Sequence, residues 1–339
     1  MNKLIFHILV MSSTGSSLYG IIRILQSIRG KKWNSRCQYQ FFKWNFLFYL
    51  IPFTLGIEVI KWYQTFLKAT NHSLFHFEKI RSIVFIKNFI NLSDLKFRIF
   101  ELLMIIWMIG VMIALIIQWK KEKELTQYID GTSILIQNPT IRRQFEKAKH
   151  TAQYYDQIDC YENPYLKAPI LLGTKDKKLV LPIEIKEEEA QYLVMLHEIM
   201  HAKRKDVNKR KMVQRLKAIF WFHPGVYFYT KTYNHWSELS CDEDVMKLIS
   251  PKEQLYYIEL VVQITSKNFY KKELQTVSFR GNDTQFEQRI QQMIRFYKKD
   301  FEPIKYLKEI FIFFILACLN VLFHLAFFAM IETYYLFEL

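Results

Sequence analysis

The chain has 339 residues, of which 51% are hydrophobic and 17% aromatic, and its formal net charge is +15. The phenylalanine and tyrosine content exceeds that of a typical soluble protein. Lysines and arginines are scattered rather than gathered in a stripe, and no recognition motif accompanies them, which argues against nucleic-acid binding. Basic loops beside a membrane and contact with anionic lipid explain the positive charge better.

Three apolar segments occupy the first third of the chain. Residues 4–22 are apolar but rich in serine, which suits close helix packing in a membrane, and residues 44–63 are apolar until Glu58 and Lys61. Residues 99–119 contain an unbroken apolar run long enough to span a bilayer. We predict a transmembrane helix at each.

The middle of the chain reads as a small sheet followed by helices. Predicted strands cover 133–137, 169–172 and 179–181, and the last two form a hairpin around Gly173. The predicted helices cover 187–205, 208–222, 234–249, 252–267 and 284–298. An edge strand of such a sheet can align an extended peptide by backbone pairing.

Positions 197–201 read HEIMH, an HExxH motif. On a helix, residues four apart lie on one face, so His197 and His201 can reach the same ion. Glu198 lies between them, where a glutamate can act as general base on a water molecule at the metal. A surface helix with two unrelated histidines is the alternative. The surrounding residues favour a zinc site.

A hydrolytic zinc site needs a third protein ligand and one open position. Glu238 lies in a predicted helix, and Asp242 follows it by one turn, which suits a ligand carboxylate with a second carboxylate that orients a ligand histidine. Helix geometry also allows Cys241, a softer ligand, but HExxH sites usually take a carboxylate or a third histidine. We predict Glu238 as the ligand, Asp242 as its supporting partner and Cys241 as a buried thiol.

Two further residues have open roles. Asp206 either caps the helix that follows the motif or supports a metal ligand from behind, and the sequence allows both. His235 precedes Glu238 by three residues, so it is a candidate for stabilising the developing oxyanion. A hydrogen-bonded structural histidine is the alternative for His235.

Two apolar segments complete the chain. Residues 217–229 belong either to the domain core or to a segment that dips into the inner leaflet, and Pro224 interrupts any continuous helix there. Residues 310–331 form the fourth predicted transmembrane helix, and we expect Asn320 and His324 within it to hydrogen bond to neighbouring helices rather than to bind metal.

Basic residues near the ends of the spans predict the orientation. The 23–43 loop contains six basic residues and no acidic one, and lysines also follow the third span and precede the fourth. Both termini are therefore expected outside a bacterial cell membrane. The domains predicted are a membrane region at 1–118, a cytoplasmic zinc metallopeptidase domain at 119–308, and a last span with a short extracellular end at 309–339.

Several motifs together resemble a known family, the membrane metallopeptidases of the beta-lactam-sensing antirepressor type found in penicillinase and methicillin-resistance systems. The resemblance covers roughly residues 1–335. It rests on APILLG at 168–173, KLVLP at 178–182, HEIMHAKRKD at 197–206, FWFHP at 220–224 and ELSCD at 238–242.

The resemblance implies one Zn²⁺ in a gluzincin-like site, with His197, His201 and Glu238 as ligands and Glu198 as base. It also implies proteolysis at the inner membrane face that relieves a winged-helix transcriptional repressor. Such sensors carry an extracellular penicillin-binding domain after the fourth span, whereas this sequence ends at Leu339. We therefore expect this chain to lack that sensor.

The predicted fold is mostly α, with four transmembrane helices and a cytoplasmic α+β zincin domain. The predicted function is regulatory zinc-dependent endoproteolysis, with a protein substrate, the lipid bilayer and a second copy of the chain as partners. A quality-control or processing protease of the heat-shock or prenyl-protease type is the alternative enzyme. A signalling scaffold without turnover is the alternative that is not an enzyme.

Overall fold

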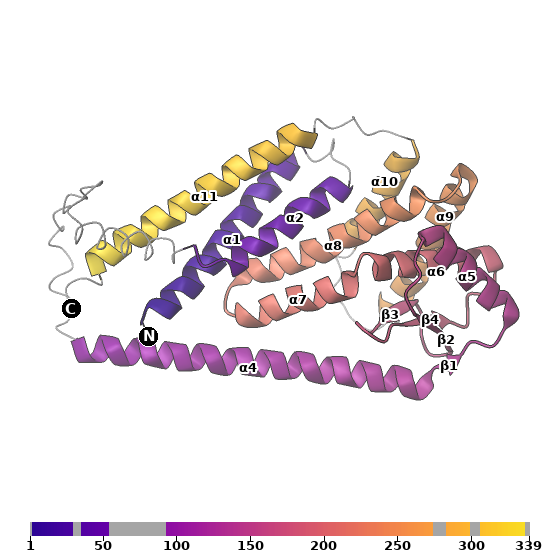
Figure 1. Ribbon diagram of the computed structural model, residues 1–339, viewed down its shortest axis with the longest axis horizontal. Coiled ribbons are helices and arrows are strands. Elements are labelled where there is room, and N and C mark those ends of the chain that lie inside the picture. The colour runs from indigo at the N-terminus through magenta and orange to yellow at the C-terminus, as the bar shows by residue number, and fades with distance from the viewer. Residues whose placement is uncertain (1, 30–34, 54–92, 274–282, 299–305, 336–339) are drawn as a thin grey trace.

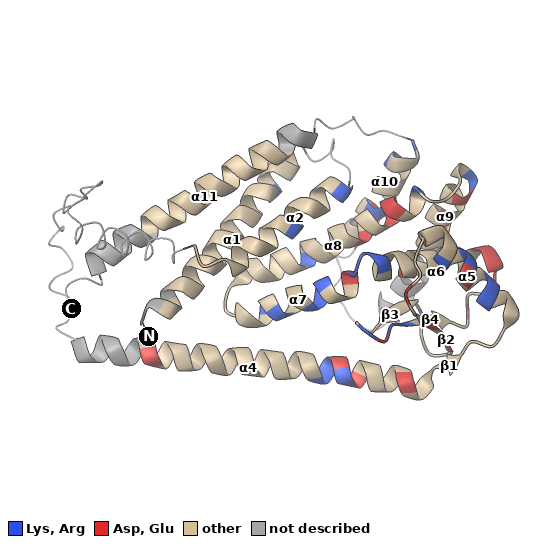
Figure 2. Ribbon diagram, viewed as in Figure 1, with Lys and Arg blue, Asp and Glu red and all other residues tan. Residues whose placement is uncertain are grey.

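Long helices and a small mixed layer of strands and helices occupy opposite ends of the computed structural model (Figure 1). The structure describes residues 2–29, 35–53, 93–273, 283–298 and 306–335. Charged side chains gather around the strands and the helices beside them, whereas α1, α11 and much of α4 carry few (Figure 2). This separation is what a protein half in lipid and half in water requires.

The apolar end consists of α1 (Asn2–Arg29), α2 (Ser35–Leu50), α4 (Ser93–Thr132) and α11 (Tyr306–Tyr335). Among the described residues, three helical segments are long and apolar enough to cross a membrane: His7–Ile28, Glu101–Thr132 and Ile310–Phe327. The predicted spans at 4–22, 99–119 and 310–331 each overlap one of these.

The prediction for residues 44–63 needs correction where the structure describes it. Helix α2 ends at Leu50, and residues 51–53 are not helical, so no single helix runs on through Pro52. Proline lacks the N–H that the next turn requires and disfavours a helical residue before it. Residues 54–63 lie outside the described part, so the fourth span stays a prediction.

A four-stranded sheet has the order β1-β2-β4-β3. Its strands are β1 (Ile134–Leu135), β2 (Asp159–Asn163), β3 (Ile170–Leu172) and β4 (Lys178–Pro182). β2 and β4 pair in parallel, and the other two pairs are antiparallel. The β3–β4 hairpin was predicted, and Gly173 in its turn has a φ of 82°, a conformation that favours glycine. β3 is left at the edge, as a substrate-aligning strand must be.

The helices of this end are α5 (Pro139–Ala152), α6 (Glu188–Lys203), α7 (Asp206–Ile219), α8 (Pro224–Met246), α9 (Pro251–Glu273) and α10 (Asp283–Tyr297). All but α5 were predicted, as was every strand but β2. The beginning of α5 still follows ordinary rules, because the Asn138 side chain accepts a hydrogen bond from the Thr140 N–H and Pro139 opens the helix. α6 packs between α5 and the sheet in the larger of two hydrophobic cores.

The α7–α8 hairpin connects the two ends of the molecule. α7 stops at Ile219 and Pro224 opens α8, so the proline separates two helices as predicted. Phe220, Val226 and Tyr229 near the turn are at most 1% exposed and belong to the second core, which α1, α2 and α11 also build. These residues of 217–229 therefore pack in a protein core that they share with the apolar helices.

Polar groups hold the hairpin turn and the last helix against α1. Ser16 lies 3.1 Å from Nδ1 of His223 and 3.0 Å from the hydroxyl of Tyr49. Asn320 accepts a hydrogen bond from Ser17 at 2.7 Å and donates one to the carbonyl of Thr14 at 3.0 Å. The prediction that Asn320 bonds to a neighbouring helix is therefore confirmed.

Gly110 of α4 provides a test of the hairpin's docking. A Cβ built on Gly110 would lie 2.3 Å from the Trp221 ring, whereas a Cβ on Gly131 of the same helix meets nothing within 4 Å. We expect Gly110→Ala to cost about 1–3 kcal/mol through overpacking. Gly131→Ala should be neutral or stabilising, because alanine is the better helix former. Thermal unfolding of both variants in detergent measures the difference, and equal melting temperatures would contradict this packing.

Candidate metal centre

Helix α6 carries the HExxH motif through the interior of the protein. Twelve of its 16 residues are buried, and Glu188 and Glu189 occupy its first turn, where the helix dipole favours negative charge. The helix ends at Lys203, and Lys205 adopts a φ of 57° that turns the chain sharply into α7. A helix covered on so many sides keeps His197 and His201 in fixed positions.

The two histidines of the motif face one another. Their Nε2 atoms lie 3.1 Å apart, and the rings are edge to face with centroids 4.7 Å apart. The Nδ1 atom of each ring is engaged elsewhere, that of His201 with Asp206 at 2.9 Å and that of His197 with Tyr257 at 2.7 Å. Protons on Nδ1 leave both Nε2 lone pairs directed at the same point, which is the arrangement of a metal ligand pair.

Glu238 of α8 reaches the same point from the second helix. Its carboxylate oxygens lie 3.6 Å from Nε2 of His197 and 3.5 Å from Nε2 of His201. Two donor atoms that are each 2.0–2.2 Å from one tetrahedral ion stand roughly 3.3–3.5 Å apart. The three side chains therefore have the donor types and approximate spacing of a Zn²⁺ site.

Each histidine is supported by a buried carboxylate. Asp206 is 0% exposed and also pairs with Arg204 at 3.0 Å and Lys209 at 3.1 Å. Burial alone would raise the pKa of Asp206, but His201 and the two cations lower it to about 2. The cap position of α7 is Lys205 rather than Asp206, and the Asp206 carboxylate contacts Nδ1 of His201.

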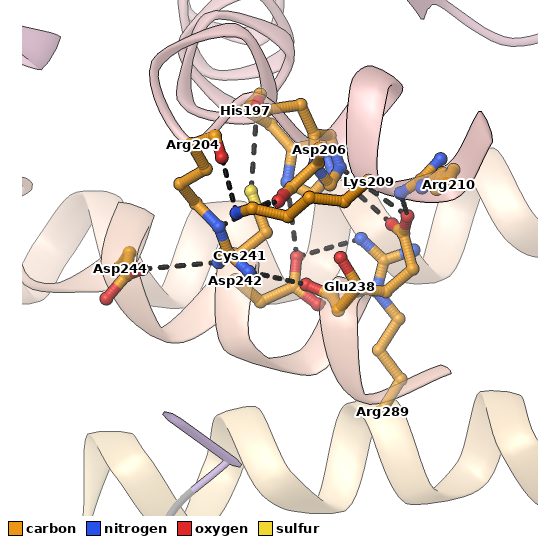
Figure 3. A network of polar contacts seen from close by, with 12 residues as sticks. His197, Arg204, Asp206, Lys209, Arg210, Glu238, Cys241, Asp242, Asp244 and Arg289 are labelled. Carbon is orange, nitrogen blue, oxygen red and sulfur yellow. Dashed lines mark hydrogen bonds and ion pairs between the residues drawn. The ribbon is translucent and has the colours of Figure 1, made fainter. Parts of the chain in front are cut away.

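Asp242 supports His197 in the same manner. It is 1% exposed, lies 3.3 Å from Nδ1 of His197 and accepts a hydrogen bond from Tyr257 at 2.7 Å. Arg289 of α10 donates hydrogen bonds to both carboxylate oxygens of Asp242, at 2.6 and 2.8 Å (Figure 3). Burial would raise the pKa of Asp242, but Arg289 and His197 hold it well below its usual range.

Sequence reasoning missed three residues of this centre, namely Tyr257, Arg289 and Arg210. Arg289 follows Asp242 by 47 residues and belongs to an amphipathic helix, where an arginine ordinarily faces solvent. No local pattern distinguishes such a residue from its neighbours. Only the packing of α9 and α10 against α8 brings Tyr257 and Arg289 to the carboxylate.

Cys241 lies close enough to compete as a ligand. The ligand atoms of His197, His201 and Cys241 all lie within 4.8 Å of one another, so these three form a buried cluster able to hold an ion. The Cys241 thiol also points to the carbonyl oxygen of His197, at 3.7 Å, and is fully buried in the core. Glu238, in contrast, is 30% exposed and faces the cleft.

The charged groups around the two histidines favour a cation bound between them. Burial alone would lower the pKa of His197, but Cys241, Asp242 and Glu238 outweigh that effect and raise it to about 10. Burial is likewise outweighed at His201, whose pKa is raised well above its ordinary value. The negative groups that raise the pKa of both imidazoles would also favour a divalent cation bound beside them.

An open cleft of about 310 Å³ leads to the histidines. Glu198, 9% exposed, lines it together with His197, His201 and Glu238. The edge strand β3 forms one wall, and apolar side chains of α9 form another. A peptide extended along β3 would therefore pass directly over the motif.

His235 lies elsewhere among the residues that the structure describes. It does not line this cleft, and it hydrogen bonds to Gln288 while its buried Nε2 atom has no hydrogen-bond partner in the described structure. Burial is the main reason that its pKa falls to about 4. The predicted oxyanion role is not supported by this placement. Two arginines of the described residues, Arg210 and Arg289, line the cleft, and Arg210 is the one that pairs with Glu238.

The apolar helices and the paired histidines that could hold an ion fit the class of membrane metallopeptidases. The family described as BlaR1 peptidase M56 matches residues 7–294, and the chain belongs to it. The resemblance to the beta-lactam-sensing antirepressor family is thereby confirmed.

Two curated relatives show how far the similarity extends. Regulatory protein BlaR1 of Bacillus licheniformis is 28% identical over 163 residues, which is 48% of this chain and 27% of the relative. Methicillin resistance mecR1 protein of Staphylococcus aureus is 25% identical over 175 residues, or 48% of this chain and 28% of the relative. The match thus spans little more than a quarter of either relative.

Proposed function

We propose that this protein is a zinc-dependent endopeptidase in which His197, His201 and Glu238 bind one Zn²⁺ and Glu198 is the general base. The observation that carries the proposal is the meeting of two Nε2 atoms and one carboxylate at the floor of a cleft that Glu198 also lines. Membership of a metallopeptidase family supports it. Glu238 is preferred to Cys241 because it lines the cleft, where a hydrolytic ion must be reached by substrate.

Each group of residues in the cleft has a separate role in the proposed reaction. β3 aligns an extended segment of the substrate by backbone hydrogen bonds, as an unpaired edge strand can. Zinc, when bound, supplies Lewis-acid polarisation of the scissile carbonyl. Glu198 takes a proton from the attacking water and delivers it to the nitrogen of the leaving amine. Asp206 and Asp242 keep the two imidazoles in the tautomer that directs Nε2 to the ion.

We further propose four transmembrane helices, termini outside and the peptidase domain in the bacterial cytoplasm. The basic 23–43 loop and the lysines near residue 120 support this orientation. The names of the relatives, a regulatory protein and a methicillin-resistance protein, suggest a role in signalling. A winged-helix repressor is accordingly the protein substrate to examine first.

The substitution Glu198→Gln tests the enzymatic proposal. It removes the base and leaves the proposed ligands in place, so zinc content should be unchanged while turnover falls about 10²–10⁴-fold. Metal analysis and cleavage of a quenched-peptide library measure the two effects. Glu189→Gln, at an exposed position in the first turn of the same helix, is the matched control and should cleave normally. Unchanged cleavage by Glu198→Gln would refute the proposal.

The same variant identifies the substrate in cells. Proteins that accumulate uncleaved with Glu198→Gln but not with wild type are the candidates, and comparative proteomics detects them. One stabilised repressor would support the regulatory role. Many misfolded membrane proteins would support quality control instead.

A further inference from the structure

Arg210 and Arg289 are the arginines that line the cleft among the described residues, and Arg210 is the one paired with Glu238. Arg210 lies near the beginning of α7 and lines the same cleft as Glu198 and the histidines. Its NH2 group donates a hydrogen bond to Oε1 of Glu238 (Figure 3). That oxygen is also the one 3.5 Å from Nε2 of His201, so the guanidinium borders the point at which the donor atoms converge.

The other cations of the centre are each committed to a buried carboxylate. Arg289 is bidentate to Asp242, and Arg204 and Lys209 both pair with Asp206. Those carboxylates are at most 1% exposed, so their cations neutralise charge in the interior. Arg210 differs because its side chain is 38% exposed and its partner Glu238 is 30% exposed.

Arg210 also has N–H donors that its contact with Glu238 does not use. A guanidinium carries five N–H donors, and this contact employs only the NH2 group. Its buried Nε atom has no hydrogen-bond partner within the described residues. Because the Arg210 side chain is 38% exposed, its remaining N–H donors include some that a molecule bound in the cleft can reach.

Peptide hydrolysis creates an acceptor for such donors at this place. When the water oxygen adds to the carbonyl carbon, the C=O π electrons move to the carbonyl oxygen, which becomes negative. The proton of the water passes to Glu198 and then to the amine nitrogen as the C–N bond breaks. A fixed cation beside that oxygen lowers the barrier, and arginine remains protonated throughout.

We propose that Arg210 is a further catalytic residue, which donates hydrogen bonds to the carbonyl oxygen of the scissile peptide and stabilises its developing negative charge. This inference rests on the proposed endopeptidase function. Its rival is a positioning role, in which Arg210 only holds Glu238 in place for the metal. The two roles differ in what zinc binding should show.

The test compares Arg210→Gln and Arg210→Lys with wild type in the full-length, zinc-loaded protein in detergent micelles. Lys211→Gln is the matched control, because Lys211 is the next residue of α7 and pairs with Glu122 of α4 rather than lining the cleft. Three quantities are measured. They are zinc affinity by chelator competition, kcat and KM on the library peptide that wild type cleaves fastest, and the inhibition constant of a phosphoramidate dipeptide that mimics the tetrahedral oxyanion.

For Arg210→Gln we expect zinc affinity and KM close to wild type, with kcat reduced about 10²–10³-fold, as loss of an oxyanion donor elsewhere causes. Inhibitor binding should weaken by a similar factor, and Arg210→Lys should recover part of both. Loss of zinc affinity, or an unchanged kcat with zinc bound, would overturn the inference. Wild-type protein that neither cleaves the library nor binds the phosphoramidate would instead refute the endopeptidase function on which it depends.

Discussion

Replacement of Arg289 by leucine is expected to destabilise the protein by about 3–5 kcal/mol, because it leaves a buried carboxylate without its cation. Asp242 is 1% exposed and both its oxygens are held by Arg289. Zinc affinity should also fall, by roughly 10–100-fold, since Asp242 orients His197. Thermal unfolding and chelator competition measure the two losses.

A second variant separates stability from metal binding. In the double variant Arg289→Leu with Asp242→Leu, both charges are removed, and burial of two apolar side chains should restore much of the melting temperature. Zinc affinity should remain low, because His197 still lacks the carboxylate that fixes its tautomer. Recovery of both properties together would mean that Asp242 has only a structural role.

Glu238→Gln and Cys241→Ser decide which residue is the third ligand. We expect Glu238→Gln to weaken zinc binding by more than the roughly 10–100-fold that loss of an outer partner costs, because it removes a ligand charge. Cys241→Ser should retain near-normal zinc affinity, since the thiol lies in the core and bonds to the carbonyl of His197. Metal titration of both proteins gives the answer. The reverse order would assign the ion to the His197–His201–Cys241 cluster.

The elements that sequence predicted best are those with strong local signals. A short stretch of sequence is enough to recognise the apolar runs of α4 and α11, the β3–β4 hairpin and helix α6. The predicted span at 44–63 does not match α2, because the prediction followed hydropathy and took no account of Pro52. β2 was missed because its sequence, DCYEN, is polar, and its place in the sheet comes from pairing with β4.

The candidate metal centre also contains some residues that local spacing predicts and others that only helix packing brings together. The i,i+4 spacing of His197 and His201 requires nothing beyond a helix to bring them together. Asp206 and Asp242 were candidates from their positions, but their partners Arg204, Tyr257 and Arg289 depend on how helices pack. His235 precedes Glu238 by three residues, a spacing that places the two on a similar face of the helix. It nevertheless lies outside the cleft, which only the packing around α8 decides.

The sequence alone predicts the proposed chemistry, since the candidate ligands, the candidate base and the apolar spans are properties of the residues and their local spacing. The tertiary structure alone decided which cations neutralise the buried carboxylates, that β3 stays at the sheet edge, and that Arg210 faces the cleft. These depend on contacts between residues far apart in the chain, whose geometry is set by the packing of whole helices. Local sequence patterns do not predict such packing.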